Sequence, residues 1–276
     1  MTDQLRERWA AGGTALGAWI SLRDPIVAET AATVGFDYVC VDLQHGLNDY
    51  DGMANAVAAM ARTGVTPLVR VPWNEPGIIG RALDAGAAGV IIPMVNSVDE
   101  AQRAVSACHY WPIGTRSFGP IALGARGGFA GIEAANEQVL CIPMIETREA
   151  VERIDDILDV PGISAVYIGP ADLSITYGLR PGMDQSDDEW NAGIAKVVAS
   201  CLAHDVIAGV HSSAALAAKR GEQGFRMITV TSDLGSVAAG FGADLRASRE
   251  ATAADVDPLD AAIAEMLETA PDDPLE

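Results

Sequence analysis

Short runs of apolar residues alternate along this chain with longer, Ala-rich stretches in which apolar residues recur at helical spacing. The short runs are rich in Val and Ile, as the buried strands of a parallel sheet are. Eight such strands are predicted, at residues 15–20, 37–42, 67–71, 89–93, 139–145, 165–169, 206–210 and 226–230. Eight strands, each followed by a plausible helix, favour an α/β fold of the (β/α)8 barrel type over an open doubly wound sheet.

Two segments depart from this alternation. Residues 110–131 form a long, Gly-rich connection without periodicity, which we interpret as a lid or an interface element. The chain after residue 250 predicts one short amphipathic helix, at about 258–267, and an acidic end at 271–276. Because no linker rich in Pro, Gly or Ser interrupts the pattern, we predict one barrel domain over 1–276, with 250–276 as its C-terminal helix and tail.

Composition argues against some classes of binding partner and indicates a cellular compartment. The chain has 38 Asp and Glu against 18 Lys and Arg, a net charge of −20, which repels nucleic acid and anionic membrane surfaces. No apolar run reaches the roughly 18 to 20 residues that cross a bilayer, so we expect a cytoplasmic protein. The four cysteines are far apart without CxxC spacing, and we expect them to be reduced core residues.

Polar residues that end apolar strands are the first candidates for chemistry, because barrels of this kind place their active sites at the carboxyl ends of the strands. The candidates, in chain order, are His45, Arg70, Glu146, Asp172 and His211. Two carboxylates with an imidazole and a guanidinium fit a hard divalent cation that keeps positions open for water and substrate oxygens.

Each candidate also has a simpler interpretation. Glu146 and Asp172 precede helices and are also placed to cap them. A histidine in the position of His45, taken alone, is more often a hydrogen-bonded loop residue than a catalyst, and His211 is equally well interpreted as a surface histidine. Arg70 is harder to set aside, because a desolvated cation must pair or bind an anion.

The lysines exclude one mechanism. Lys196 and Lys219 are the only two in the chain, and both fall inside predicted helices. A Schiff base needs a desolvated amine in the pocket. Enolate chemistry here would therefore depend on a metal ion and Arg70.

Six ordered strings carry a family resemblance. They are Asp42-Leu-Gln-His45-Gly, Val69-Arg70-Val-Pro72, Leu83-Asp84-Ala-Gly86, Ile92-Pro-Met-Val95, Ile145-Glu146-Thr-Arg-Glu-Ala150 and Ile168-Gly-Pro-Ala-Asp172-Leu-Ser. From about residue 17 to 233 the chain resembles the HpcH/HpaI aldolases, the metal-dependent pyruvate aldolases of the 4-hydroxy-2-oxoheptanedioate and hydroxypyruvate aldolase type.

The resemblance implies a (β/α)8 barrel in which Glu146 and Asp172 are ligands of Mg²⁺, Mn²⁺ or Co²⁺. It also implies that the backbone N–H groups of Ala171 and Asp172 receive the carboxylate of a 2-oxo acid.

The same resemblance assigns Arg70 to the developing enolate oxygen. It assigns His45, made more basic by Asp84, to proton transfer.

The chain departs from that family pattern at three positions. Gln44 stands where many relatives have Glu, and Met144, which cannot donate an amide hydrogen bond, stands where they have Gln. His211 falls where relatives tend to carry an apolar residue near the aldehyde. We interpret Met144 and His211 as substrate-binding positions that influence donor and acceptor preference.

Function and assembly follow as expectations from the resemblance. The first is a class II aldolase that cleaves 4-hydroxy-2-oxo acids into pyruvate or hydroxypyruvate and an aldehyde. The alternatives are a malyl-CoA or citramalyl-CoA type lyase and a catalytically weakened barrel that binds a 2-oxo acid. The resemblance further implies a homohexamer of swapped dimers, in which the last helix packs on a neighbouring barrel.

Overall fold

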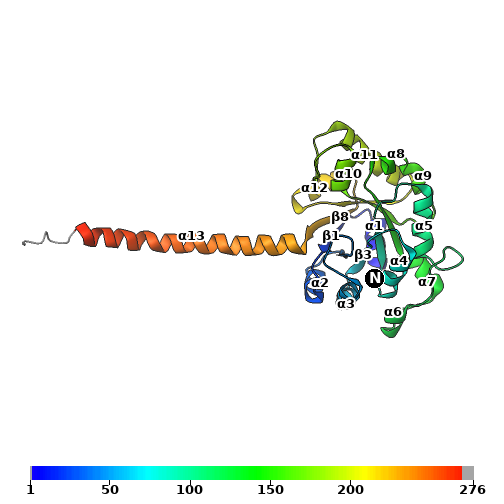
Figure 1. The fold of residues 1–276 in the computed structure, drawn as a ribbon, viewed down its shortest axis with the longest axis horizontal. Helices are drawn as coiled ribbons and strands as arrows, with labels where there is room; N and C mark the ends of the chain where they lie inside the picture. Colours follow the sequence, from blue (N-terminus) through cyan, green and yellow to red (C-terminus); the bar gives the residue numbers. More distant parts are fainter. Residues whose placement is uncertain (1, 269–276) are drawn as a thin grey trace, which may run out of the picture. The chain divides into compact units, whose positions relative to one another are not determined.

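The computed structural model describes residues 2–268, and its eight strands form one closed parallel barrel in the order β1 to β8 (Figure 1). The strands are β1 Ala15–Ile20, β2 Tyr38–Asp42, β3 Thr66–Arg70, β4 Gly89–Ile92, β5 Leu140–Ile145, β6 Ala165–Ile168, β7 Ile207–His211 and β8 Met227–Ser232. Every predicted strand is confirmed to within two residues at either end. The (β/α)8 barrel is therefore the fold of this chain.

Helices separate the strands and surround the barrel (Figure 1). They are α1 Thr2–Ala10, α2 Pro25–Thr33, α3 Tyr50–Met60, α4 Pro76–Asp84, α5 Val98–Cys108, α6 Ile121–Ala125, α7 Ile132–Gln138, α8 Arg148–Glu152, α9 Ile154–Leu158, α10 Pro170–Thr176, α11 Asp188–Ala203, η1 Ala214–Leu216, α12 Ala217–Glu222 and α13 Asp233–Glu268. The connection predicted to be irregular, 110–131, contains the short helix α6.

Alternation of side chains along each strand divides the apolar residues between two clusters. On β2, Tyr38 and Cys40 belong to the cluster inside the barrel, whereas Val39 and Val41 belong to the larger cluster between the strands and the helices. Successive side chains of a strand point to opposite faces of a sheet, so both faces of this one are covered. This double burial explains the continuous apolar runs of the sequence.

Helix α1 closes the amino-terminal end of the barrel. Leu5 is 1% exposed and packs in the interior cluster. The Trp9 indole donates to the Arg226 carbonyl at 2.9 Å, and Arg6 Nη2 donates to the Val139 carbonyl at 3.2 Å. With this end covered, the open mouth lies at the carboxyl ends of the strands.

The chain divides into two compact units, the barrel unit up to Asp233 and a second unit from Leu234. Helix α13 starts at Asp233, so the short helix predicted at about 258–267 is in fact part of one 36-residue helix. The helix expected after the eighth strand forms its first part, so the sequence analysis missed only that the two helices are continuous. The single-domain division with a tail from residue 250 stays a prediction, and the acidic end at 271–276 lies outside the described residues.

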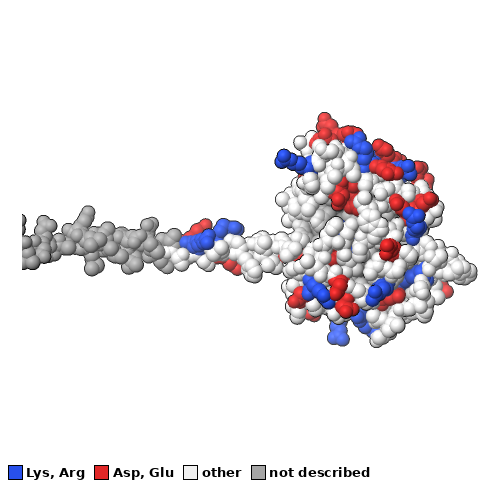
Figure 2. Space-filling model, in the orientation of Figure 1, with Lys and Arg blue, Asp and Glu red and all other residues white. Residues whose placement is uncertain are grey.

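All four cysteines are buried free thiols, as expected, and burial raises the pKa of Cys201 to about 12. None of the described helices has the length and hydropathy of a bilayer-spanning segment. Acidic and basic side chains are mixed over the visible face of the barrel unit (Figure 2).

The same substitution, Gly→Ala, is expected to have opposite effects on the free energy of unfolding at two glycines of the barrel unit. A Cβ on Gly17 would lie 2.2 Å from the buried Tyr38 ring, whereas a Cβ on Gly80, in α4, would meet no atom within 4 Å. We expect Gly17→Ala to lower the free energy of unfolding by about 1–3 kcal/mol through overpacking. Gly80→Ala should raise it by about 0.5–1 kcal/mol through helix propensity. Denaturant unfolding measures both, and equal effects would contradict this account.

Candidate functional site

A pocket of about 310 Å³ opens at the carboxyl ends of the strands. Its lining residues come from seven of the eight strands and from the segments that follow them. They are Trp19, Ser21, Asp42, His45, Arg70, Met144, Tyr167, Gly169, Pro170, Ala171, Asp172, Met183, His211 and Ser232. The structure thus brings together all of the predicted site residues except Asp84 and Glu146, and the latter lies directly beneath the lining.

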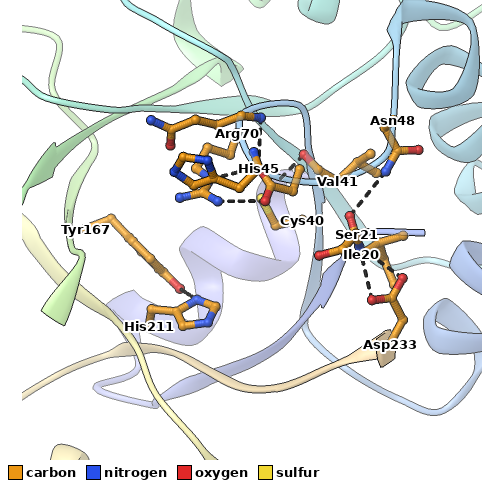
Figure 3. A network of polar contacts seen from close by, with 12 residues as sticks. Ile20, Ser21, Cys40, Val41, His45, Asn48, Arg70, Tyr167, His211 and Asp233 are labelled. Carbon is orange, nitrogen blue, oxygen red and sulfur yellow. Dashed lines mark hydrogen bonds and ion pairs between the residues drawn. The ribbon is translucent and has the colours of Figure 1, made fainter. Parts of the chain in front are cut away.

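The centre of the pocket is an ion pair between neighbouring strands. Asp42 and Arg70 end β2 and β3 in the same register, and Arg70 donates from Nε at 2.8 Å and from Nη2 at 2.6 Å to the two carboxylate oxygens (Figure 3 shows Arg70). Burial opposes ionisation of Asp42, but the bonds from Arg70 hold the pKa of that carboxyl below its usual value. Sequence reasoning missed Asp42, although it stands within one of the quoted strings.

The pair fixes its surroundings as well. Asp42 Oδ1 also accepts from the backbone N–H groups of Gln44 at 2.9 Å and His45 at 3.3 Å, which holds the turn after β2. The Arg70 guanidinium lies 4.9 Å from the centre of the Trp19 ring, a cation–π contact. The bonds to Asp42 use Nε and Nη2, so the N–H groups of Nη1 remain for a ligand.

Glu146, directly after β5, is 2% exposed. Its Oε1 accepts from the Met94 N–H at 2.7 Å. Burial, with the neighbouring Asp172 carboxylate, raises the pKa of Glu146 to about 7. A carboxylate held in this way is favoured in its charged form by a cation.

The turn after β4 supports Glu146 by an unusual backbone. Met94 has a φ of 56°, in the left-handed region, and this conformation presents its N–H to the carboxylate. Asn96 donates to the Met94 carbonyl at 3.1 Å and accepts from the Thr147 hydroxyl at 2.5 Å. The two loops that flank Glu146 are therefore tied to each other.

Gly169 packs closely against the Glu146 carboxylate. A Cβ at this position would lie 2.6 Å from Glu146 Oε2 and 3.1 Å from Met144 Cε. The absence of a side chain here allows the carboxylate to approach the start of α10. Met144 itself is 2% exposed and forms part of the barrel core as well as of the pocket wall.

Asp172 lies in the first turn of α10 and is exposed. The first backbone bond of this turn is that from Leu173 N–H to the Gly169 carbonyl at 3.0 Å. The N–H groups of Ala171 and Asp172 precede it and are available at the pocket wall. Its neighbour Glu146 is buried, so the two carboxylates differ in exposure.

Two of the predicted residues do not meet within one chain. His45 is exposed at the pocket mouth. Asp84 ends α4, next to the amino-terminal end of β4, and accepts from Arg116 Nη2 at 2.7 Å. Arg126 donates to the neighbouring Ala85 carbonyl at 2.9 Å, so the 110–131 segment packs there and does not cover the pocket. The partnership of Asp84 with His45 stays a prediction.

His211 is part of an aromatic wall that sequence reasoning did not foresee. Its ring lies edge-on to Trp19 at 4.9 Å, and its Nδ1 is 3.4 Å from the Tyr167 hydroxyl (Figure 3). Tyr167 shares the Thr229 hydroxyl with Tyr38, at 2.5 and 2.9 Å. Burial and the charge of Arg70 lower the pKa of His211 to about 4, so this imidazole is neutral at pH 7.

The turn after β1 is held by Asp233, the residue directly after β8. Asp233 accepts from the N–H groups of Ser21 at 3.0 Å and Leu22 at 2.8 Å (Figure 3 shows Ser21 and Asp233). Ser21 lines the pocket, so its place depends on this carboxylate. The motif search did not reveal Asp233, because its partners are backbone groups far away in the sequence.

The lysines lie where the sequence analysis expected, away from the pocket lining. Lys196 Nζ donates to the Glu152 carbonyl at 2.9 Å, and Lys219 pairs with Asp184 at 2.6 Å. Among the described residues no group of three or more His, Cys, Asp or Glu is arranged to hold a metal. A cation between Glu146 and Asp172 would thus take its other ligands from water or substrate, as hard cations do.

Comparisons with known proteins agree with this geometry. A hydroxypyruvate/pyruvate aldolase of Rhizorhabdus wittichii is 39% identical over 238 residues, which are 86% of this chain and 95% of that protein. A 4-hydroxy-2-oxo-heptane-1,7-dioate aldolase of Salmonella dublin is 37% identical over 182 residues, 65% of this chain and 69% of that protein. A crystal structure of an HpcH/HpaI aldolase/citrate lyase family protein from Burkholderia cenocepacia superposes with a TM-score of 0.82 at 30% identity, covering 90% of this chain and 98% of that one.

The sequence model of one family spans almost the whole barrel unit. It matches residues 15–239, from the first residue of β1 into α13. With the strand-end residues described above, this match shows that the chain belongs to the HpcH/HpaI aldolase/citrate lyase family.

Proposed function

We propose that this protein is a divalent-metal-dependent aldolase that cleaves and forms 4-hydroxy-2-oxo acids, with pyruvate or hydroxypyruvate as one product and an aldehyde as the other. The observation that carries the proposal is the meeting of Glu146, Asp172 and the Asp42–Arg70 pair at one mouth. Membership of the family makes the chain a carbon–carbon lyase. The relatives named above are aldolases of the same substrate class.

Glu146 and Asp172 are the residues that would hold the metal ion, for which we propose Mg²⁺, Mn²⁺ or Co²⁺. They fit such an ion because one carboxylate is buried close to another, an arrangement that is costly without a positive charge. When bound there, a divalent ion supplies a Lewis acid that polarises the carbonyl of a 2-oxo acid.

The other groups of the chain bind and orient the donor. Arg70 presents Nη1 to the oxygen that becomes negative in the enolate, and Asp42 keeps the guanidinium from moving. The N–H groups of Ala171 and Asp172 bind the carboxylate of the 2-oxo acid. His45, at the mouth, exchanges the proton of the 4-hydroxyl group of the 2-oxo acid, whose oxygen becomes the aldehyde oxygen on cleavage. His211 and Met144 complete the pocket wall beside the substrate.

We further propose that the protein is cytoplasmic and assembles as a hexamer of swapped dimers through α13. Within the second unit, Val237 is 41% exposed, Phe241 73% and Leu245 51%. Their spacing of four residues puts them on one face of the helix, and an exposed apolar face of this kind is typical of an interface. Sedimentation at micromolar concentration tests the assembly.

Metal dependence is tested first by removing the ion and one ligand. We expect chelation to reduce pyruvate release from a 4-hydroxy-2-oxo acid by about 10²-fold or more, and Mn²⁺ or Mg²⁺ to restore it. Glu146→Gln should abolish both the restored activity and the rise in melting temperature that the metal causes. Glu149→Gln, whose side chain is exposed beside Arg153, is the matched control and should behave as the wild type. Full activity in Glu146→Gln, or a borohydride adduct on a lysine, would refute the proposal.

The close packing of Glu146 against Gly169 predicts the effect of a second substitution. Because a Cβ on Gly169 would lie 2.6 Å from Glu146 Oε2, Gly169→Ala must displace the carboxylate. A displacement of about 1 Å costs about 10²-fold in turnover, which we expect as a fall in kcat measured at saturating metal. Gly80→Ala, which meets no atom, should leave kcat unchanged. Wild-type kcat in Gly169→Ala would mean that Glu146 does not act from its observed position.

The proposed role of His45 in proton transfer is tested by replacing it. We expect His45→Ala to slow retro-aldol turnover by about 10²-fold to 10⁴-fold while leaving the metal-induced shift in melting temperature intact. His204→Ala, a histidine on the outer surface beside Asp159, is the control. Turnover of His45→Ala equal to that of the control would remove His45 from the mechanism.

A further inference from the structure

A series of hydrogen bonds leads from the barrel interior to the pocket. Tyr38 of β2 and Tyr167 of β6 share the hydroxyl of Thr229 in β8, at 2.9 and 2.5 Å. The Tyr167 hydroxyl also lies 3.4 Å from Nδ1 of His211, which ends β7 (Figure 3). All four residues belong to strands of one barrel, so a single chain forms the whole series. We call the three hydroxyl groups of Tyr38, Thr229 and Tyr167 the hydroxyl network.

The hydroxyl network is closed to solvent. Tyr38, Thr229 and Tyr167 are each 0% exposed, and both tyrosines belong to the apolar cluster inside the barrel. A buried hydroxyl hydrogen without an acceptor is costly, because it has lost its bonds to water. The hydrogens of the network must therefore be placed among its own oxygens and the nitrogen of His211.

The number of hydrogens decides which nitrogen of His211 carries one. Three bonds join the four polar atoms, and each hydroxyl supplies one hydrogen. If Nδ1 is an acceptor, Tyr167 donates to it, Thr229 donates to Tyr167, and Tyr38 donates to Thr229. If Nδ1 carried a hydrogen, four hydrogens would compete for three bonds and one would be left over. Bonds that run in one direction also strengthen one another, so the first arrangement is favoured.

This arrangement leaves a hydrogen-bond donor at the pocket. Burial and the charge of Arg70 lower the pKa of His211 to about 4, so at pH 7 only one of its ring nitrogens carries a hydrogen. With Nδ1 as an acceptor, that hydrogen is on Nε2. His211 lines the pocket and is partly exposed, and Tyr167 occupies its Nδ1. The nitrogen that remains for a ligand is therefore Nε2, which donates.

Arg70 supplies a second donor beside this one. Its guanidinium and the His211 ring each lie 4.9 Å from the centre of the Trp19 ring. Two groups that donate hydrogen bonds suit the oxygen atoms of an oxo acid. A neutral imidazole that already carries its hydrogen on Nε2 binds such an oxygen but takes no proton from it. His211 thus differs in kind from His45, the candidate for proton transfer.

From this arrangement we propose that the hydroxyl network holds His211 in the tautomer with hydrogen on Nε2, and that Nε2 donates a hydrogen bond to an oxygen of the bound 4-hydroxy-2-oxo acid. His211 is then a substrate-binding donor, and Tyr167 is a positioning residue that acts through it. The substrate contact rests on the proposed aldolase function, whereas the tautomer is a property of the barrel itself.

Solid-state NMR tests the tautomer on the full chain with ¹⁵N-labelled histidine and Mg²⁺ at pH 7. The signals of His211 are those that His211→Phe removes. We expect the wild type to carry hydrogen on Nε2 alone. Tyr167→Phe removes the donor to Nδ1 and should add a second set of signals, from the other tautomer. Tyr50→Phe, whose ring packs under Arg81 outside the pocket lining, is the matched control and should give the wild-type spectrum.

The wild-type spectrum alone can refute the tautomer. Hydrogen on Nδ1 of His211 would overturn the proposal without any variant, even if Tyr167→Phe does not fold. A spectrum of Tyr167→Phe with the wild-type signals of His211 would overturn the positioning role of the network.

Two replacements of His211 test the contact with substrate. His211→Phe keeps a ring without a donor, whereas His211→Gln offers an amide N–H. We expect kcat/KM for pyruvate release from a 4-hydroxy-2-oxo acid to fall by about tenfold in His211→Phe, the value of one hydrogen bond. His211→Gln should recover a large part of this loss, and Tyr50→Phe should behave as the wild type. Equal values in the two His211 variants would overturn the substrate contact.

The donor half of the reaction separates this proposal from the proposed function. Deuterium exchange into the methyl group of pyruvate reports formation of the enolate and needs no aldehyde. Its absence in the wild type would overturn the aldolase function and the substrate contact together, and the NMR spectrum would still decide the tautomer. Exchange in the wild type with equal kcat/KM in His211→Phe and His211→Gln would overturn the contact and leave the function.

Discussion

The ion pair between Asp42 and Arg70 is the constraint on which the site depends. Two neighbouring parallel strands end in opposite charges at the same register, so the barrel itself brings the groups together without a loop to position them. Burial makes either charge costly alone, and the pair with two parallel bonds satisfies both. The same carboxylate holds the turn that carries His45, and the same guanidinium packs on Trp19. One pair therefore orients the anion-binding group, the candidate proton-transfer residue and an aromatic wall.

Glu146, one of the metal-ligand candidates, is held by the backbone around it and not by a paired cationic side chain. Glu146 is buried, accepts a hydrogen bond from the Met94 N–H, and lies near a second carboxylate, that of Asp172. Asp42 has a cation of its own chain, whereas Glu146 has none within bonding distance among the described residues. The backbone at Met94 and the missing side chain at Gly169 keep Glu146 in place. A site that stabilises one carboxylate internally and leaves the other for an added ion separates substrate orientation from Lewis-acid chemistry.

The sequence predicted the strands to within two residues, because both faces of a parallel barrel are buried and its strands read as continuous apolar runs. It also predicted the residues that end those strands, since the carboxyl ends of the strands share one mouth. The aromatic wall of the pocket was not predictable in the same way. Tyr167 reads as a core residue, and Met183 lines the pocket from the connection after α10, where its carbonyl accepts from the distant Arg220. Asp84 matches a motif, yet its contacts in this chain are with Arg116, which no local pattern reveals. The length of α13 was missed because small residues carry little periodicity.

The buried thiols give the barrel a chemical property of its own. Cys40 and Cys141 lie in strands and Cys201 in α11. Burial raises the pKa of the Cys40 and Cys201 thiols, and the neighbouring Cys108 together with burial raises that of Cys141. Thiolate is the form that alkylating agents and oxidants attack, so the folded barrel resists both. Reaction with such an agent requires the sheet or the helix layer to open first. The rate of thiol labelling in this protein therefore reports how often the barrel opens, and mass spectrometry can follow it without any introduced probe.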